Sequence, residues 1–197
     1  EIFLLTLLFS IPLGLVVAAG RMSSFKPLQW FMKVYISIMR GTPLMLQLIV
    51  IFFAPYYVFG IGLSSDYRMI AVILAFSINY AAYFAEIYRG GFESIPKGQT
   101  EAAQVLGYSK FQTFYMIRLP QMFKIVLPSI TNELITLVKD TSLSFVIAIP
   151  EMFTVAKQIA AADSSIMALL VAGVFYYIFN IIVAWFMEYV EKRMDYY

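Results

Sequence analysis

The sequence contains no histidine and no cysteine, and only 13% of its residues are charged. Without cysteine there is no disulfide framework and no thiolate chemistry. Without histidine the chain lacks the commonest metal ligand and the usual acid–base group at neutral pH. In soluble domains about a quarter of the residues are charged. These absences count against a water-soluble domain and against metal-dependent or histidine-based catalysis.

What the sequence has instead is long apolar runs: 61% of its 197 residues are hydrophobic, and the mean hydropathy is +0.80. A helix needs about 20 residues to cross about 30 Å of hydrocarbon. Such stretches predict five transmembrane helices, at residues 2–20, 43–62, 69–88, 123–139 and 166–187. The sequence therefore predicts an all-α, polytopic membrane protein that forms a single transmembrane domain over residues 1–197.

Basic residues are unevenly distributed between the segments that flank these spans. One side has Arg21, Lys26, Lys33, Arg40, Arg89, Lys97, Lys110, Arg118, Lys124, Lys192 and Arg193, and the other has Arg68, Lys139 and Lys157. Cytoplasmic segments of membrane proteins carry the excess of lysine and arginine. The distribution predicts that the N-terminus lies outside and the C-terminus inside, which agrees with an odd number of spans.

The segment from about residue 89 to 122 has no transmembrane pattern and is predicted to lie on the basic, cytoplasmic side. Ala102, Ala103 and Leu106 fall on one face of a short helix, and Gly107 can end that helix in a left-handed conformation. A compact knob of small residues results. We interpret it as a docking element for a soluble partner; the alternative is an ordinary amphipathic connector that lies on the bilayer.

A second short helix is predicted directly after this knob. Ser109 and Gln112 have the spacing of a capping box, in which each side chain bonds the backbone of the other. Leu119-Pro120 is expected to stop the helix, because proline has no backbone N–H to donate. The docking element is thus predicted to be two short helices joined by a glycine.

The residues of this element closely resemble the EAA loop of importer-type ABC transporter permeases. The resemblance lies in Glu101-Ala102-Ala103, in Gly107 four positions after the second alanine, and in Ile117 and Leu119-Pro120. Three further segments are similar to the polar amino-acid branch of that family: Arg40-Gly41-Thr42-Pro43-Leu44, Glu86-Ile87-Tyr88-Arg89-Gly90-Gly91 and Lys139-Asp140-Thr141-Ser142-Leu143. The resemblance covers nearly the whole chain.

The resemblance implies a type I importer permease in the cytoplasmic membrane of a prokaryote, coupled to a separate ATPase subunit. The residues that would contact the ATPase are Glu101, Ala102, Ala103, Leu106 and Gly107. The alanines would permit close approach, and Glu101 would orient the helix. Alternatively, Glu101 only favours the helix N-terminus electrostatically, which is worth under about 1 kcal/mol.

ATP and Mg²⁺ are expected in that partner, and no cofactor is expected in this chain, because the sequence lacks the G-x-x-x-x-G-K-[ST] phosphate-binding pattern. Five spans do not easily enclose a path for a polar solute. A second copy or a related permease is therefore expected to complete the pore as a dimer. The remaining expected partners are the lipid bilayer, an extracytoplasmic substrate-binding protein and the amino acid itself; no nucleic acid is expected.

Polar side chains at membrane depth are costly and tend to face a cavity or a partner. The candidates for a substrate site are Asn79, Tyr80, Asn132, Glu133, Thr136, Asp140 and Ser142. Acidic groups outnumber basic ones in this region, with Glu86, Glu133 and Asp140 against Lys139, which favours a cavity for a basic amino acid. The structural alternative is that Glu86 pairs with Arg89, one turn away, and Lys139 with Asp140 or Glu133.

Two connecting segments have predicted local structures. In Arg40-Gly41-Thr42-Pro43, the threonine is expected to cap the following helix, with the proline at its first position. From Asp140 to Ala162 the apolar run is too short to span and is broken at Pro150-Glu151. That part is predicted to be a re-entrant or interfacial piece that gates the outer side or contacts a binding protein, or else an ordered connector. Glu151, Lys157 and Asp163 are expected to be exposed for either of the first two roles.

Three classes of function remain in competition. A permease subunit of an ATP-driven amino-acid importer uses the docking element and the polar groups. An ion channel would conduct without nucleotide and has no use for a docking helix. A membrane-embedded enzyme is the third class, and a chain without histidine, cysteine or a clear pair of acidic residues argues against it.

Overall fold

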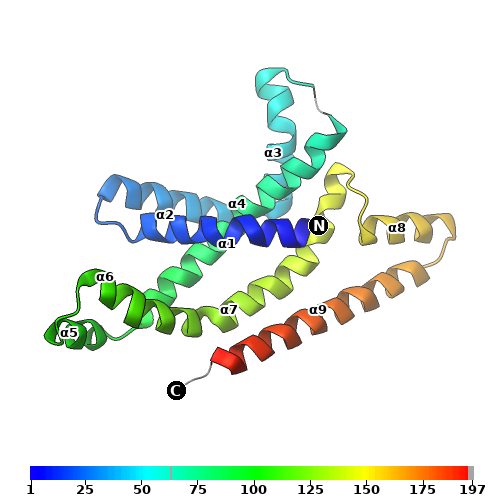
Figure 1. Cartoon of the computed structure of the whole chain (residues 1–197). Helices are drawn as coiled ribbons and strands as arrows, with labels where there is room; N and C mark the ends of the chain where they lie inside the picture. Colours follow the sequence, from blue (N-terminus) through cyan, green and yellow to red (C-terminus); the bar gives the residue numbers. More distant parts are fainter. Residues whose placement is uncertain (63, 195–197) are drawn as a thin grey trace.

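The computed structural model describes residues 1–62 and 64–194, and every regular element in those residues is helical (Figure 1). The elements are α1 (Ile2–Arg21), α2 (Lys26–Gly41), α3 (Leu44–Phe59), α4 (Ser65–Ser94), α5 (Lys97–Val105), α6 (Lys110–Gln112), a π-helical turn (Thr113–Arg118), α7 (Leu119–Asp140), a 3-10 helix (Thr141–Ile147), α8 (Met152–Ala162) and α9 (Met167–Met194). The prediction of an all-helical membrane protein is confirmed.

Three helices in the described residues are each long and apolar enough to cross a membrane: α1, α4 and α9. Two further spans are made of bent pairs. Helices α2 and α3 meet at 109°, and the helix that runs from Lys110 to Ile147 meets α8 at 60°. The predicted five spans agree with the structure if each bent pair counts as one span.

The sequence did not predict the first half of the bent pair α2–α3. Residues 26–41 were read as a basic connector, yet they form a helix with one apolar face. At its end, Thr42 donates a hydrogen bond to the carbonyl of Ile38 at 2.8 Å. Thr42 therefore closes α2 instead of capping α3, and Pro43, not Thr42, precedes the first residue of α3. The expected roles of Thr42 and Pro43 are corrected.

Helix α4 is the centre of the molecule, and α1 packs along it (Figure 1). Thr6, Ser10 and Gly14 are buried at i, i+4 spacing along α1. A Cβ atom on Gly14 would lie 2.8 Å from the Cβ of Phe84. Small residues of this kind let two helix backbones approach closely, which is how membrane helices gain packing energy. The α1–α4 pair therefore forms a tightly packed unit.

The boundaries of the docking element differ from the prediction of 89–122. Helix α4 continues to Ser94 and α7 begins at Leu119, so the connecting element is residues 95–118. Leu119-Pro120 does not stop the second short helix, because the chain remains helical from Lys110 through the π-helical turn into α7. Pro120 is the second residue of α7, and proline is tolerated in the first turn of a helix.

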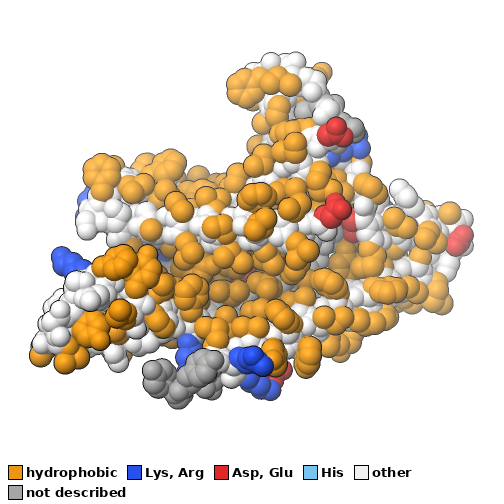
Figure 2. Space-filling view, in the orientation of Figure 1, with side chains coloured by type: hydrophobic (Ala, Val, Ile, Leu, Met, Phe, Trp, Pro, Cys, Tyr) orange, Lys and Arg blue, Asp and Glu red, His pale blue; other side chains and the backbone are white. Residues whose placement is uncertain are grey.

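Apolar side chains cover most of the face drawn in Figure 2. Lysine and arginine gather toward the left and lower edges, at the end where α5 and α6 lie in Figure 1. Most acidic side chains in this view lie toward the right, where α8 is found. The two ends of the helix bundle thus differ in charge.

Candidate functional site: a docking segment and a polar helix face

The docking segment, residues 95–118, begins with helix α5, which ends at a glycine turn. Gly107 has φ +81°, a left-handed conformation that favours glycine. The amide of Tyr108 donates to the carbonyl of Ala103 at 3.0 Å, which closes the turn. The predicted left-handed end of this helix is confirmed.

The capping box that starts α6 is also confirmed. The amide of Gln112 donates to the hydroxyl of Ser109 at 3.2 Å, and the amide of Ser109 donates to Oε1 of Gln112 at 2.9 Å. These two bonds satisfy backbone donors that a helix N-terminus otherwise leaves free. Local hydrogen bonds therefore fix the elbow between α5 and α6.

The residues of the docking segment do not all face outward. Glu101 and Ala102 are exposed, and Leu106 is 74% exposed. Ala103, in contrast, is completely buried within its own chain, so it is not available for close contact with a partner. Val105 is 88% exposed, and sequence reasoning missed it as a contact residue although it directly precedes Leu106.

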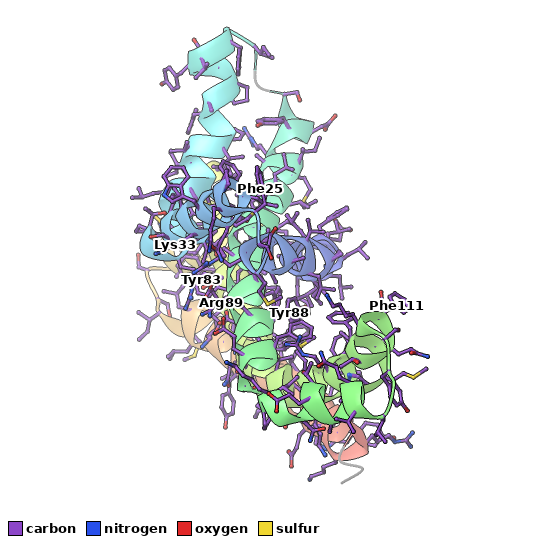
Figure 3. All side chains as sticks on the ribbon, turned by 90° about the vertical axis from the view of Figure 1, so that its left-hand side faces the viewer. Phe25, Lys33, Tyr83, Tyr88, Arg89 and Phe111 are labelled. Carbon is purple, nitrogen blue, oxygen red and sulfur yellow. The ribbon has the colours of Figure 1, made fainter. Side chains whose placement is uncertain are left out.

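Phe111 adds a third large apolar side chain to this end of the molecule, at 69% exposure (Figure 3). Val105 and Leu106 precede the Gly107 turn and Phe111 follows it; these three exposed side chains are called the apolar tip. Exposed apolar side chains that are grouped on a surface mark interaction sites.

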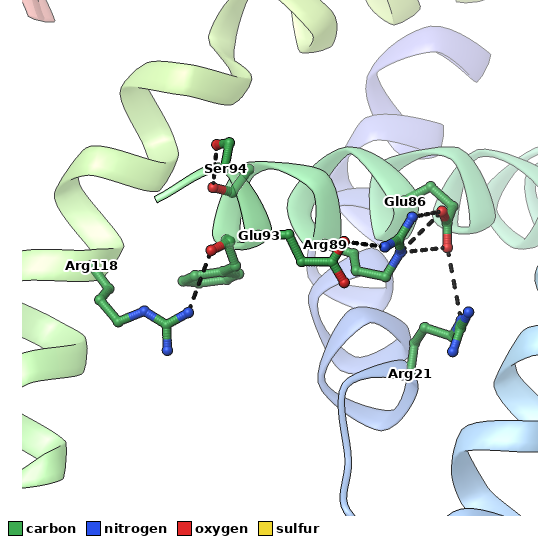
Figure 4. A network of polar contacts seen from close by, with 8 residues as sticks. Arg21, Glu86, Arg89, Glu93, Ser94 and Arg118 are labelled. Carbon is green, nitrogen blue, oxygen red and sulfur yellow. Dashed lines mark hydrogen bonds and ion pairs between the residues drawn. The ribbon is translucent and has the colours of Figure 1, made fainter. Parts of the chain in front are cut away.

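Aromatic and cationic contacts hold the docking segment against α4. The rings of Phe92 and Phe114 stack with their centroids 5.5 Å apart. The guanidinium of Arg118 lies 5.6 Å from the centroid of Phe92 and donates to the Phe92 carbonyl at 3.4 Å (Figure 4). These contacts join the docking segment to the end of α4.

An ion-pair network continues from that point to α1. Arg89 bonds both oxygens of Glu86 and also pairs with Glu93, and Nε of Arg21 lies 4.0 Å from Glu86 (Figure 4). The structural alternative for Glu86, a pair with Arg89, is confirmed. Glu86 thus joins α1 to α4 and is not an open group of a substrate cavity.

The candidate substrate residues fall into two groups, and the first is buried. The Tyr80 hydroxyl donates to Oδ2 of Asp140 at 2.8 Å, which links α4 to α7. Asn79 does not join them: its amide donates to the Met39 carbonyl at 3.0 Å and to Oε1 of Gln47 at 2.9 Å. Asn79 therefore holds the bend between α2 and α3.

The second group lies on the open face of α7 and just beyond it. Asn132 and Thr136 are exposed, and Glu133 and Ser142 are half-buried. The Thr136 hydroxyl donates to the Asn132 carbonyl at 2.9 Å, within the helix. Polar groups on an exposed face at membrane depth require water or another protein surface. This face is consistent with the wall of an aqueous path.

Arg40 is a polar residue near this region that sequence reasoning assigned only to the membrane surface. Its guanidinium lies 5.2 Å from the centroid of Tyr83, a residue of α4. The amphipathic pattern of residues 26–41 indicates a helix and would have placed Arg40 beside α4, whereas these residues were treated as a connector.

The connector between α7 and α9 contains an internal cap. Glu151 accepts hydrogen bonds from the amides of Phe153 at 2.7 Å and Thr154 at 2.6 Å, and from the Tyr176 hydroxyl at 3.1 Å. The expectation that Glu151 is an exposed contact group is corrected, because its carboxylate fixes the start of α8 and ties it to α9.

Comparison with known proteins assigns the class of this molecule. The family described as "binding-protein-dependent transport system inner membrane component" matches residues 10–196. A membrane protein with a docking segment at one end and a polar helix face is what such a transport component requires. The chain belongs to this family, which confirms the prediction of a permease subunit rather than an enzyme.

Several curated proteins are similar over nearly the whole chain. The L-cystine transport system permease protein TcyB of Bacillus subtilis is 36% identical, covering 98% of this chain and 82% of its own. The arginine transport system permease protein ArtQ of the same species is 35% identical, covering 98% and 88%. The glutamate/aspartate import permease protein GltK of Escherichia coli is 34% identical, covering 91% and 83%.

Solved structures agree on the fold. An amino acid ABC transporter crystallised with histidines is 28% identical, with a TM-score of 0.88 over 98% of this chain and 88% of its own. The MetNI methionine ABC transporter in an inward-facing conformation is 16% identical, with a TM-score of 0.76 over 98% and 89%, which is a likeness of fold.

Proposed function

We propose that this chain is the transmembrane subunit of an ATP-driven importer that moves polar amino acids, with a preference for basic ones, across the cytoplasmic membrane of a prokaryote. The observation that carries the proposal is the exposed apolar tip of Val105, Leu106 and Phe111 on a fixed turn. It is supported by the family membership and by relatives whose names refer to cystine, arginine and glutamate or aspartate.

The docking segment lies on the cytoplasmic side in this proposal, with the N-terminus outside and the C-terminus inside. The gathering of lysine and arginine at the end that carries α5 and α6 supports this orientation (Figure 2). The apolar tip then faces the compartment that contains ATP. The Arg118, Phe92 and Phe114 contacts and the Arg89, Glu86 and Arg21 contacts carry the motion of the tip to α4 and α1.

ATP and Mg²⁺ bind to a separate ATPase subunit that receives Glu101, Ala102, Leu106 and Gly107, together with Val105. Closure of that subunit on ATP moves the docking segment as a rigid body, because local hydrogen bonds fix its elbow. A soluble substrate-binding protein delivers the amino acid on the opposite side, near α8.

A second permease copy, or a homologous permease, faces the polar side of α7 and completes the path as a dimer. Asn132 and Thr136 line the path, and Asp140 with Tyr80 lies beside it. Glu133 supplies negative charge near the guanidinium of Arg40, and the pair of groups suits a substrate that carries both charges. The acidic groups favour a cationic side chain.

The test is reconstitution of the permease with its ATPase and binding protein in proteoliposomes. ATP hydrolysis and uptake are measured against a panel of arginine, lysine, histidine, glutamine, glutamate and cystine. Leu106→Asp should lower substrate-stimulated hydrolysis at least about tenfold, because a buried charge replaces an apolar contact at the interface. Ile166→Asp is the matched control, since Ile166 is 70% exposed at the start of α9, away from the docking segment.

The same assay tests the charge of the path. Glu133→Gln should reduce uptake of arginine and lysine relative to glutamine. An unchanged order of substrates would contradict the basic preference, and uptake that persists without the ATPase would contradict the importer itself.

A further inference from the structure

A cavity of about 440 Å³ lies at the end of the bundle that carries the docking segment. Its walls come from the C-terminal ends of α1 and α4, the first turns of α2 and the π-helical turn before α7. Among its lining residues are Arg21, Gln29, Arg89, Glu93 and Arg118. Figure 4 shows the three arginines at this place, with Arg21 and Arg118 approaching from different segments of the chain.

Arg21 and Arg118 have guanidinium N–H donors that are not used in the hydrogen bonds described for them. A guanidinium carries five N–H donors. Arg89 uses its Nε and both terminal nitrogens on Glu86 and Glu93. Within the described residues, Arg21 reaches only to 4.0 Å from Glu86, and Arg118 makes one hydrogen bond, to the Phe92 carbonyl at 3.4 Å. Most donors of Arg21 and Arg118 are therefore available to a ligand.

The charge of the cavity is not balanced by the chain. Glu86 and Glu93 are both bonded to Arg89, and Glu86 also lies 4.0 Å from Arg21, so these three arginines and two acids together keep one net positive charge. The Arg21 side chain is only 23% exposed, so water neutralises it incompletely. Guanidinium groups in such a setting bind anions with several acceptor oxygens, and phosphoryl groups match their geometry. The cavity therefore suits a phosphoryl group.

The surroundings indicate a membrane lipid as the source of that group. Helix α2 begins beside the cavity; Phe25, which directly precedes it, is 65% exposed (Figure 3). Trp30 in α2 is 66% exposed. Exposed aromatic side chains next to basic groups are typical of the headgroup level of a bilayer, where anionic lipids attract arginine. Helices α1 and α4, whose ends form the cavity, are both long enough to cross a membrane.

We propose that this cavity binds the phosphoryl headgroup of an anionic lipid between Arg21 and Arg118. The inference rests on the proposed function for its orientation in the membrane. A bound headgroup bridges α1 to the docking segment and adds to the contacts that Phe92 and Glu86 already make there. Coupling of ATP hydrolysis to uptake then depends on anionic lipid.

The experiment measures lipid retained by the purified permease–ATPase complex in nanodiscs of phosphatidylcholine with phosphatidylglycerol, by native mass spectrometry. Arg21→Gln with Arg118→Gln should lower retained phosphatidylglycerol about tenfold, since each arginine contributes to the attraction. Lys33→Gln with Arg193→Gln is the matched control: it removes the same charge from exposed positions near the same end, outside the cavity, and should retain the lipid.

Three further readouts decide the assignment. Arg118→Lys, which keeps the charge, should recover part of the binding and excludes simple misfolding as the cause of a loss. Equal loss in both double variants would overturn the site, because it would show general surface attraction. Stabilisation of the complex in neutral lipid by inorganic phosphate alone, as large as that given by phosphatidylglycerol, would overturn the lipid assignment.

The outcomes also separate this inference from the proposed function. Substrate-stimulated ATP hydrolysis of the unmodified complex tests the importer. If that activity is present in every lipid mixture and is independent of phosphatidylglycerol, the lipid site is refuted and the importer stands. If no amino acid stimulates hydrolysis in any mixture, the proposed function fails, whatever lipid is retained.

Discussion

Helices α4 and α9 are both apolar enough to cross a membrane, with 29 and 28 residues in their candidate spans, yet they have opposite surroundings. In the most apolar window of α4, 61% of the residues are buried inside the chain, whereas in α9 the figure is 6%. Hydropathy therefore identifies a membrane helix but does not say whether its neighbours are protein or lipid. That information lies in how the side chains pack against neighbouring helices.

Helix α4 combines small residues, which allow close approach, with the buried large side chains of Phe76, Tyr80, Phe84 and Tyr88. Its fully buried positions include Ala71, Ala75, Ala81, Ala82 and Ala85. Alanine and glycine let neighbouring helices approach closely, and this contact replaces the hydrophobic driving force that is absent in lipid. On α9, large side chains point outward, among them Leu170, Phe175, Ile182 and Trp185. Helix α9 is suited to contact lipid or a second subunit, and α4 is suited to the centre of one chain.

The largest expected difference in stability between the two helices comes from replacing one glycine in each by alanine. A Cβ on Gly91 of α4 would lie 2.2 Å from Cγ1 of Val126, whereas a Cβ on Gly173 of α9 would meet nothing within 4 Å. Gly91→Ala should destabilise the chain by about 1–3 kcal/mol or more, because β-branched Val126 has little freedom to move. Gly173→Ala should be neutral or stabilising, by up to about 1 kcal/mol.

Thermal unfolding of the purified permease in detergent, followed by fluorescence-detected gel filtration, measures both variants. Gly90→Ala serves as a control within α4, since a Cβ there also meets nothing within 4 Å. Equal losses in Gly91→Ala and Gly90→Ala would mean that α4 and α7 are not packed as described. A loss of dimer in Gly173→Ala, with the monomer intact, would identify α9 as part of the subunit interface.

A smaller effect is expected from the two asparagines. Asn79 of α4 donates two hydrogen bonds, to the Met39 carbonyl and to Gln47, whereas Oδ1 of Asn180 in α9 is buried without a partner in the described residues. Asn79→Leu should cost about 1–3 kcal/mol, because it leaves Oε1 of Gln47 without this donor and removes one of the two donors to the Met39 carbonyl, the other being Nε2 of Gln47. Asn180→Leu should be neutral or stabilising for the isolated chain.

The same unfolding assay compares these variants, and Asn79→Asp adds a test of the amide donor at nearly constant volume. If Asn180→Leu destabilises the isolated chain more than Asn79→Leu does, the assignment of the two helices to different surroundings is wrong. If Asn180→Leu instead weakens dimers without changing the monomer, the partner for its amide comes from the second subunit.

The features that sequence predicted correctly are those decided by neighbours in the chain. The left-handed Gly107 and the Ser109–Gln112 capping box depend on residues within one or two turns. Apolar runs likewise identify α1, α4 and α9 directly. For these features the local order of residues in the sequence is enough to predict the structure.

The features that sequence did not predict depend on distant contacts. Asn79 was a substrate candidate because it is polar at membrane depth, but its partner, the Met39 carbonyl, lies 40 positions away. Ala103 was expected to face a partner, yet it packs within its own chain, and helical periodicity cannot distinguish the two faces. The pairing of Tyr80 with Asp140, 60 positions apart, places two predicted residues together without defining the substrate.

The smallest effect is expected from the acidic residues near the ends of the two helices. Glu86 of α4 is 19% exposed at its side chain and bonds Arg89 at 2.6 Å while it lies 4.0 Å from Arg21. Glu188 of α9 is 59% exposed and pairs with Lys192 at 2.7 Å. Exposed pairs contribute little to stability, and partly buried ones cost more when one partner is removed.

Glu86→Gln should therefore lower stability by about 1 kcal/mol, whereas Glu188→Gln should be indistinguishable from the unmodified chain in the same unfolding assay. Raising the salt concentration should narrow this difference only slightly, because the α4 pair is shielded from solvent ions. If the two variants behave alike at both low and high salt, the end of α4 is as open to water as the end of α9. The link that Glu86 makes between α1 and α4 would then contribute nothing to moving α1 with the docking segment.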